Sequence, residues 1–276
     1  VAVTGTTPIT VTGTSLNLTA TARDQFAQNL ETQPSLNWAT MTSPVGSTAK
    51  LTGDTHSLLF EPDTAGKYTV RVQSGNVYAD ISIAVTQTLT SMALELPDGT
   101  TPTADQPLIV DKTSATLKLN GLDQFGKTMG TLPKITWSTP VVPTAATANV
   151  KLTGTAAACT FTRIGDYTVA AAFGNVTCSA SFKAVPTLTS FAITRDGTAV
   201  TGSTPITVAG TSLNLAATAR DQFAQNLETQ PSLNWVASAS PVDCQPTIQS
   251  SDRSASVSFP RSGSYTISLS SGTLVV

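Results

Sequence analysis

Few residues in this chain have side chains that catalyse reactions or bind metal ions. The 276 residues include one histidine, His56, and three cysteines, Cys159, Cys178 and Cys244. A serine nucleophile needs a base held against its hydroxyl group, and a structural zinc site needs about four thiolate or imidazole ligands. We therefore expect no catalytic residue, no cofactor and no metal ligand, and we predict that the protein is not an enzyme.

Three aspartates could bind calcium, since each begins the same tripeptide, Asp-Gln-Phe. They are Asp24, Asp123 and Asp221. Calcium takes about six to eight oxygen ligands, commonly from several carboxylates, and acidic residues do not cluster around these positions. An aspartate in a turn accepts hydrogen bonds from nearby backbone N–H groups, and this is the role that we predict for all three.

The tripeptide is one landmark of an internal repeat. The aspartate, a tryptophan and a tyrosine each recur with steps of 99 and then 98 residues, and residues 4–38 and 201–235 differ at only three positions. Three landmarks in one register predict three copies of one domain. We call them repeat one (1–88), repeat two (89–186) and repeat three (187–276). The tryptophans are Trp38, Trp137 and Trp235, and the tyrosines are Tyr68, Tyr167 and Tyr265.

The two ends of the chain are ragged against this period. Val1 aligns with Thr198, so we expect repeat one to lack the strand at 190–194 of repeat three. Val276 aligns with Ala79, so we expect repeat three to stop inside its last strand. We interpret the chain as a window of a longer array, or as a subunit whose missing strand comes from a neighbour. The joints at 88–91 and 187–190 both read Thr-Leu-Thr-Ser, without glycine, which predicts stiff connections.

Hydrophobic residues alternate with polar ones in every repeat. In repeat one this pattern covers 16–23, 36–38, 68–72 and 79–83, and it predicts half-buried β-strands. Gly75-Asn76 and Gly174-Asn175 separate two such runs, where a two-residue hairpin turn is expected. No capped stripe with helical spacing is present. Each repeat of about 98 residues is therefore predicted to be an all-β sandwich of about seven strands, with the first and last copies incomplete.

A glycine stands two residues before the tyrosine in every repeat, which predicts a tyrosine whose hydroxyl group bonds back to the chain at a strand crossover. With the Asp-Gln-Phe turn, the proline before the tryptophan strand (Pro34, Pro133, Pro231) and the Gly-Asn hairpins, the whole chain resembles the bacterial immunoglobulin-like (Big-type) domains of large surface and secreted proteins. A glycine often follows the phenylalanine in that family. Here it is Gly126 in repeat two, but Ala27 and Ala224 in the outer repeats.

The tryptophans and tyrosines occupy one register in all three repeats, so we predict that they are structural core residues and not a platform for sugars. Asn17 and Asn175 lie in Asn-x-Thr triplets and are predicted to be accessible to glycosylation. The alignment places Cys159 and Cys178 on different sheets, with Cα atoms about 13 Å apart, whereas a disulfide needs less than about 7 Å. They are predicted to be two buried thiols. Cys244 is expected in a loop, as a free or intermolecular thiol.

Composition bears on partners and location. With 15 Lys and Arg residues and a net charge of −2, the chain does not suit nucleic acid, and no apolar run approaches the length of a membrane span. We expect neighbouring repeats or identical chains as partners, and a surface glycan or a host or cell-surface protein as the external candidates. The resemblance implies an extracellular or cell-surface location.

Three functions remain open at this stage. The first is a structural segment of an extracellular surface protein, serving as a stalk, spacer or adhesin shaft. The second is a subunit of an extracellular filament or sheath, assembled when one chain supplies a strand to the next. The third is a carbohydrate-binding accessory of a secreted enzyme, which would depend on Tyr78, the one tyrosine outside the repeated pattern.

Overall fold

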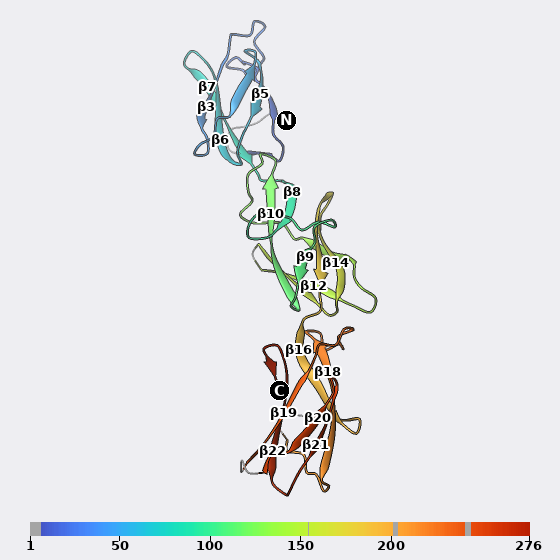
Figure 1. Cartoon of the computed structure of the whole chain (residues 1–276). Helices are drawn as coiled ribbons and strands as arrows, with labels where there is room; N and C mark the ends of the chain where they lie inside the picture. Colours follow the sequence, from blue (N-terminus) through green and yellow to red (C-terminus); the bar gives the residue numbers. More distant parts are fainter. Residues whose placement is uncertain (1–6, 154, 201–203, 241–243) are drawn as a thin grey trace.

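The computed structural model describes residues 7–153, 155–200, 204–240 and 244–276, and in these residues the regular elements are β-strands. Three sandwiches follow one another along the chain, end to end (Figure 1). The prediction of tandem immunoglobulin-like sandwiches is confirmed, because each repeat packs one sheet against another and the strand order matches that fold.

Repeat two contains both sheets with four strands each. One sheet has the order β12-β13-β10-β8, and the other has the order β11-β14-β15-β9. The strands are β8 (Leu89–Glu95), β9 (Leu108–Val110), β10 (Ser114–Asp123), β11 (Thr136–Val141), β12 (Ala148–Thr153), β13 (Ala156–Phe161), β14 (Gly165–Phe173) and β15 (Val176–Ala184). All neighbours are antiparallel except β9 and β15, which run parallel.

Repeat one has the same second sheet, in the order β1-β7-β6-β3, but its first sheet has three strands in the order β2-β5-β4. The strands are β1 (Ile9–Val11), β2 (Leu16–Thr19), β3 (Asn37–Thr42), β4 (Lys50–Gly53), β5 (Ser57–Glu61), β6 (Gly66–Ser74) and β7 (Val77–Val85). The sequence predicted a strand over 16–23, and the structure ends it at Thr19. The turn at Gly75-Asn76 joins β6 to β7 as expected.

Repeat three has a first sheet in the order β17-β16-β18-β21-β20 and a second sheet in the order β19-β22-β23. The strands are β16 (Leu188–Arg195), β17 (Thr198–Val200), β18 (Ser212–Asp221), β19 (Asn234–Ser240), β20 (Thr247–Ser250), β21 (Ser254–Ser258), β22 (Ser264–Ser271) and β23 (Leu274–Val275). β23 has two residues where β7 and β15 have nine each.

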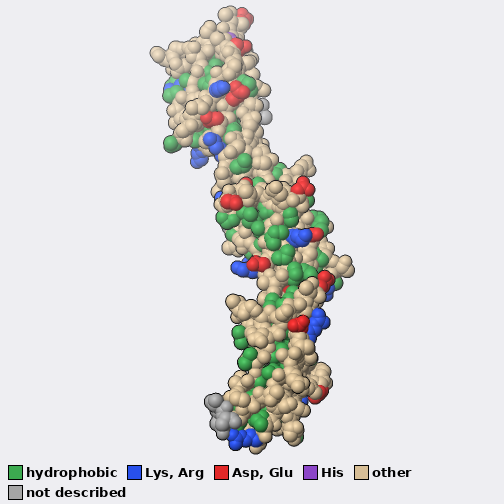
Figure 2. Space-filling view, in the orientation of Figure 1, with side chains coloured by type: hydrophobic (Ala, Val, Ile, Leu, Met, Phe, Trp, Pro, Cys, Tyr) green, Lys and Arg blue, Asp and Glu red, His purple; other side chains and the backbone are tan. Residues whose placement is uncertain are grey.

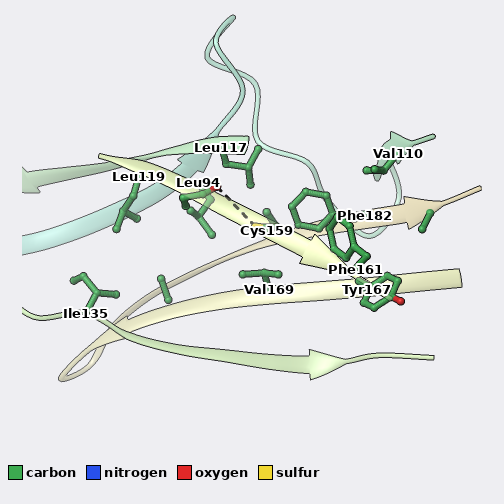
Figure 3. Close-up of a cluster of buried hydrophobic side chains, with 14 of the residues drawn as sticks. Leu94, Val110, Leu117, Leu119, Ile135, Cys159, Phe161, Tyr167, Val169 and Phe182 are labelled. Carbon is green, nitrogen blue, oxygen red and sulfur yellow. Dashed lines mark hydrogen bonds between the residues drawn. The ribbon is translucent and has the colours of Figure 1, made fainter. Parts of the chain in front are cut away.

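Each sandwich has its own core, built from the inward-facing residues of the two sheets. In repeat two, Cys159 and Phe161 of β13 face Tyr167 and Val169 of β14, and Phe182 of β15 closes the aromatic end (Figure 3). The Phe161 ring lies 4.8 Å from that of Tyr167 and 5.1 Å from that of Phe182, between centroids. Offset and tilted ring pairs of this kind stabilise a core beyond their buried area.

The surface carries few charges. In Figure 2 most of the visible face consists of neutral polar side chains and backbone, with isolated basic and acidic residues and no large patch of one sign. Charged residues make up 12% of the sequence. No helix in the described residues is long and apolar enough to cross a membrane.

Candidate functional site: the joints between repeats

The Asp-Gln-Phe turns have one geometry in all three repeats. In repeat two, Oδ1 of Asp123 accepts hydrogen bonds from the backbone N–H groups of Phe125 and Lys127, each at 2.9 Å. Asp24 and Asp221 accept the corresponding pairs at 2.8–2.9 Å. These bonds hold the turn closed, which is the role that the sequence predicted for the aspartates. The described residues contain no cluster of three or more metal-ligating side chains.

The glutamine of the turn fastens one repeat to the next. The side-chain nitrogen of Gln124 donates to the carbonyl oxygen of Thr86 at 2.7 Å, and its side-chain oxygen accepts from the N–H of Thr88 at 2.7 Å. Thr86 and Thr88 flank a single residue of the connection between β7 and β8. One planar amide therefore occupies the place that a neighbouring strand would take, and it fixes the backbone of the connection.

The second joint repeats this arrangement. The side chain of Gln222 donates to the carbonyl oxygen of Val185 at 2.7 Å and accepts from the N–H of Thr187 at 2.9 Å. The intervening residue is Pro186, which has no N–H of its own to satisfy. The two joints therefore share one clamp, built from a glutamine amide and two backbone groups that lie two residues apart.

The phenylalanine of the turn completes the joint. Phe125 packs against the core of repeat one, and Phe223 packs against the core of repeat two, so each is contributed by the following repeat. The carboxylates beside them are removed from water, since Asp123 and Asp221 are 1% and 2% exposed. The first joint has further bonds, including those from Thr88 Oγ1 to the carbonyl oxygen of Thr12 at 2.9 Å and from Gln87 to Oδ2 of Asp123 at 3.0 Å.

The turn of repeat one has the same hydrogen bonds as the other two turns, but its glutamine and phenylalanine contact no other repeat in the described residues. Asp24 caps it in the same way, but Phe26 is 73% exposed and Gln25 is exposed. From the sequence, the tripeptide was interpreted as a turn that marks each repeat, and the contacts of its glutamine and phenylalanine with the preceding repeat were not predicted. A signal for the joint was present in the sequence. The aspartate has a role within its own turn, but the Gln-Phe pair that follows it in all three repeats has none there.

The aromatic landmarks occupy similar positions with different burial. Tyr68 and Tyr167 are buried and Tyr265 is half-buried, and each hydroxyl group donates at 2.8 Å to the carbonyl oxygen four residues earlier in the chain. Trp235 is buried, whereas Trp38 and Trp137 are only partly buried and pack against the margins of their cores. All three tryptophans lie on a strand that ends its sheet, β3, β11 or β19, so the predicted core position holds fully for Trp235 and in part for the other two.

The cysteines differ in burial from the prediction. Cys159 is fully buried, and burial raises the pKa of its thiol to about 11. Cys178 is half-buried and not buried as predicted, because it lies near the hairpin end of β14 and β15, opposite Ala171. Burial raises its pKa as well. Both are free thiols. Cys244 was expected in a loop, and its side chain is buried. Asn17 and Asn175 are both exposed.

The remaining candidate residues are held by neighbours. Tyr78 is exposed, but the guanidinium carbon of Arg71 lies 3.9 Å from the centre of its ring, and Arg71 also pairs with Asp80 at 2.7 Å. The ring face that could stack on a sugar is therefore already covered on one side. Nδ1 of His56 lies 2.9 Å from Oγ1 of Thr55, on a turn before β5.

Comparisons with known proteins give matches of low similarity. No protein-family model and no curated protein matches the chain. Domains 4–9 of the surface layer protein SbsC match with 15% sequence identity and a TM-score of 0.30, over 95% of this chain and 41% of that one. The titin fragment I67–I69 matches with 13% identity and a TM-score of 0.37, over 96% and 90% of the two chains. The chain thus spans about two fifths of the surface layer structure, and its assignment as a series of immunoglobulin-like sandwiches rests on its own strand pairing.

Proposed function

We propose that the chain is a stiff, non-enzymatic structural segment of an extracellular cell-surface protein, serving as a stalk, spacer or adhesin shaft. The observation that carries the proposal is the shared clamp at the two joints, where Gln124 and Gln222 bond to the backbone of the connection. A flexible linker would let neighbouring sandwiches change their relative orientation. A clamped joint with a packed phenylalanine restricts that orientation, as a stiff segment requires.

The surface composition agrees with this role. Neutral polar side chains dominate, with 49 threonines in 276 residues, and strands that face solvent on one side accept threonine well because it is β-branched. The side chains that could perform chemistry are few, and His56 is engaged with Thr55. The carbohydrate-binding alternative rests on Tyr78, and Arg71 covers one face of that ring.

Small-angle X-ray scattering on the purified chain tests the rod. At about 40 Å per sandwich, from strands of about ten residues at about 3.4 Å each, we expect a maximum dimension of about 100–120 Å. The double variant Gln124→Ala/Gln222→Ala should broaden the distribution of interatomic distances. The variant Gln25→Ala is the matched control, because it removes the same residue from the turn that lies outside the two joints. Equal profiles for all three proteins would contradict the proposed role of the clamps.

The location is tested separately. Antibodies raised against the purified chain should label intact cells that produce the parent protein, without permeabilisation. Labelling that requires permeabilised cells would contradict the surface location and leave the rod geometry unaffected.

A filament or sheath subunit is the second candidate, and one feature of repeat one favours it. Among its described residues, the first sheet of that repeat has three strands where repeat two has four, and β2 pairs with β5 alone.

A further inference from the structure

Two segments of nearly identical sequence form strands of different length. Residues 15–24 and 212–221 differ at one position, where Thr19 is replaced by Ala216. β18 covers all ten residues, but β2 covers only Leu16–Thr19. The extra half of β18, from Ala216 to Asp221, pairs with β16. The length of the strand is therefore set by a neighbouring segment and not by local sequence. We call β8 and β16 the leading strands of repeats two and three.

The corresponding part of repeat one borders an apolar groove. The groove has a volume of about 320 Å³, and its lining includes Ala20, Ala22, Leu30, Leu36, Val72 and Val77. In repeat three, the counterparts of Ala20 and Ala22 are Ala217 and Ala219, which are 3% and 0% exposed beneath the leading strand. In repeat one the same two residues are half-exposed.

Repeat two shows what fills this position. Leu94 and Leu89 of the leading strand belong to its core, together with Met129, Ile135 and Ala171. By the repeat alignment, these last three are the counterparts of Leu30, Leu36 and Val72 in the groove. Leu94 pairs with Leu119, the counterpart of Ala20. The groove therefore accepts apolar side chains at alternate positions of an extended strand, as Met92 and Leu94 show in repeat two.

The backbone beside the groove is arranged for pairing. The N–H of Ala20 donates to the carbonyl oxygen of His56, and Ala22 exchanges bonds with the side-chain amide of Gln33. Alternate backbone groups of an extended chain point to opposite sides, so those of Thr21 and Arg23 point to the open edge. Their counterparts in repeat two, Asn120 and Leu122, pair with the leading strand.

The joint residues continue the same surface. Gln25 and Phe26 are exposed, while Gln124 and Phe125 clamp the connection that precedes the leading strand of repeat two. The groove, the edge at Thr21 and Arg23, and the Gln25-Phe26 turn of repeat one thus correspond to the three parts of repeats two and three that hold the connection and the leading strand.

We propose that this face of repeat one binds, by β-strand addition, an extended segment like the connection and leading strand that repeats two and three each hold. The occupant is an extended segment of the pattern Thr-Leu-Thr-Ser-φ-Ala-φ, where φ is an apolar residue, as in 88–94 and 187–193. Gln25 clamps its backbone two residues apart, Thr21 and Arg23 pair with it, and its apolar residues fill the groove. This inference rests on the proposed rod function and deepens it, since it gives this face of repeat one the binding role that the two joints have.

A synthetic peptide with the sequence of Val85–Leu96 is the probe, because it carries both the clamped residues and the leading strand. We expect saturable one-to-one binding to the full chain in fluorescence anisotropy, and slower hydrogen exchange at Thr21 and Arg23. Gln25→Ala should weaken binding by about tenfold or more, and Ala22→Phe should abolish it by filling the groove. Gln222→Ala is the control, since it changes the same residue at an occupied joint and should bind the peptide normally. A peptide with serine in place of Leu89, Met92 and Leu94 should not bind.

Three outcomes would overturn the inference. The first is the absence of saturable binding up to about 1 mM peptide. The second is equal binding by Gln25→Ala, Ala22→Phe and the unchanged chain. The third is dimerisation of the chain through this face, seen by sedimentation and lost in Ala22→Phe, which would make a second copy the occupant. Failure of the rod proposal appears instead in the scattering profiles of Gln124→Ala/Gln222→Ala and leaves peptide binding unchanged.

Discussion

Ala27 and Gly126 occupy the same position of the Asp-Gln-Phe turn, with φ angles of 63° and 70°. This is the left-handed region, which glycine enters without cost and which alanine avoids because its Cβ approaches the following carbonyl oxygen. Ala224 adopts the same conformation in repeat three, with φ at 59°. The turn is therefore imposed on the two alanines by the aspartate that caps it.

Replacing Ala224 by glycine should stabilise repeat three by about 1 kcal/mol, since the left-handed conformation costs a residue with a Cβ about that much. Gly126→Ala should destabilise repeat two by a similar amount. Urea unfolding followed by circular dichroism measures both changes. Ala39→Gly is the control, because Ala39 lies in a strand, where glycine costs about 0.5–1 kcal/mol. If Ala224→Gly destabilised the chain as Ala39→Gly does, the turn would not constrain this residue.

Removing a tyrosine hydroxyl group should lower the free energy of unfolding where that group bonds back to the chain before its strand. Tyr167→Phe loses the bond that the hydroxyl group donates to the carbonyl oxygen of Arg163 and the one that it accepts from the N–H of Arg163, and we expect a loss of about 1–2 kcal/mol. Tyr265→Phe should cost less, since Tyr265 is only half-buried. Tyr78→Phe should be close to neutral. The order of the three unfolding midpoints is the test, and a cost for Tyr78→Phe as large as that for Tyr167→Phe would refute it.

Acid should weaken repeat one through Asp63. Its carboxylate accepts hydrogen bonds from the hydroxyl groups of Ser47 and Thr48 and from the N–H of Thr48, and these bonds lower its pKa to about 2. A folded-state pKa below the unfolded value contributes stability above about pH 4, and this contribution is lost as the pH falls through about 2. Thermal unfolding at pH 7, 4, 3 and 2 should show this loss.

Repeat two supplies a natural control for this effect. Its counterpart of Asp63 is Thr162, whose hydroxyl oxygen accepts from the N–H of Thr147 at 2.8 Å and does not titrate. Asp63→Thr should therefore cost about 1 kcal/mol at pH 7 and should flatten the acid response of repeat one. An acid response that is the same in Asp63→Thr would assign the loss to other carboxylates.

The sequence predicts those parts of the molecule that are determined within one repeat. The three sandwiches, the Gly-Asn hairpins and the capped turns follow from alternation, glycine placement and recurrence, because each depends on residues near in sequence. The length of β2 could not be predicted in this way. Residues 15–24 carry nearly the sequence of β18, and the difference in length depends on pairing with a strand from elsewhere.

The joint lay beyond sequence reasoning for the same reason. Gln124 acts on Thr86 and Thr88, which are 38 and 36 residues away, and nothing in the tripeptide itself specifies that contact. Burial was also misjudged for Trp38 and Trp137. An alternating pattern assigns the inward face of a strand, but it does not give the degree to which a side chain on that face is covered.

The thiol of Cys159 should be unreactive until repeat two unfolds. The side chain is fully buried, and its pKa of about 11 leaves a small fraction of thiolate at pH 8, about 240-fold less than for a thiol with a pKa of about 8.5. A variant that keeps only Cys159, with alanine at 178 and 244, should react with a disulfide reagent more than 100-fold more slowly when folded than in urea. A variant that keeps only Cys178 should react faster when folded, because that side chain is half-buried. Equal rates for the two variants would show that repeat two opens more readily than its packed core implies.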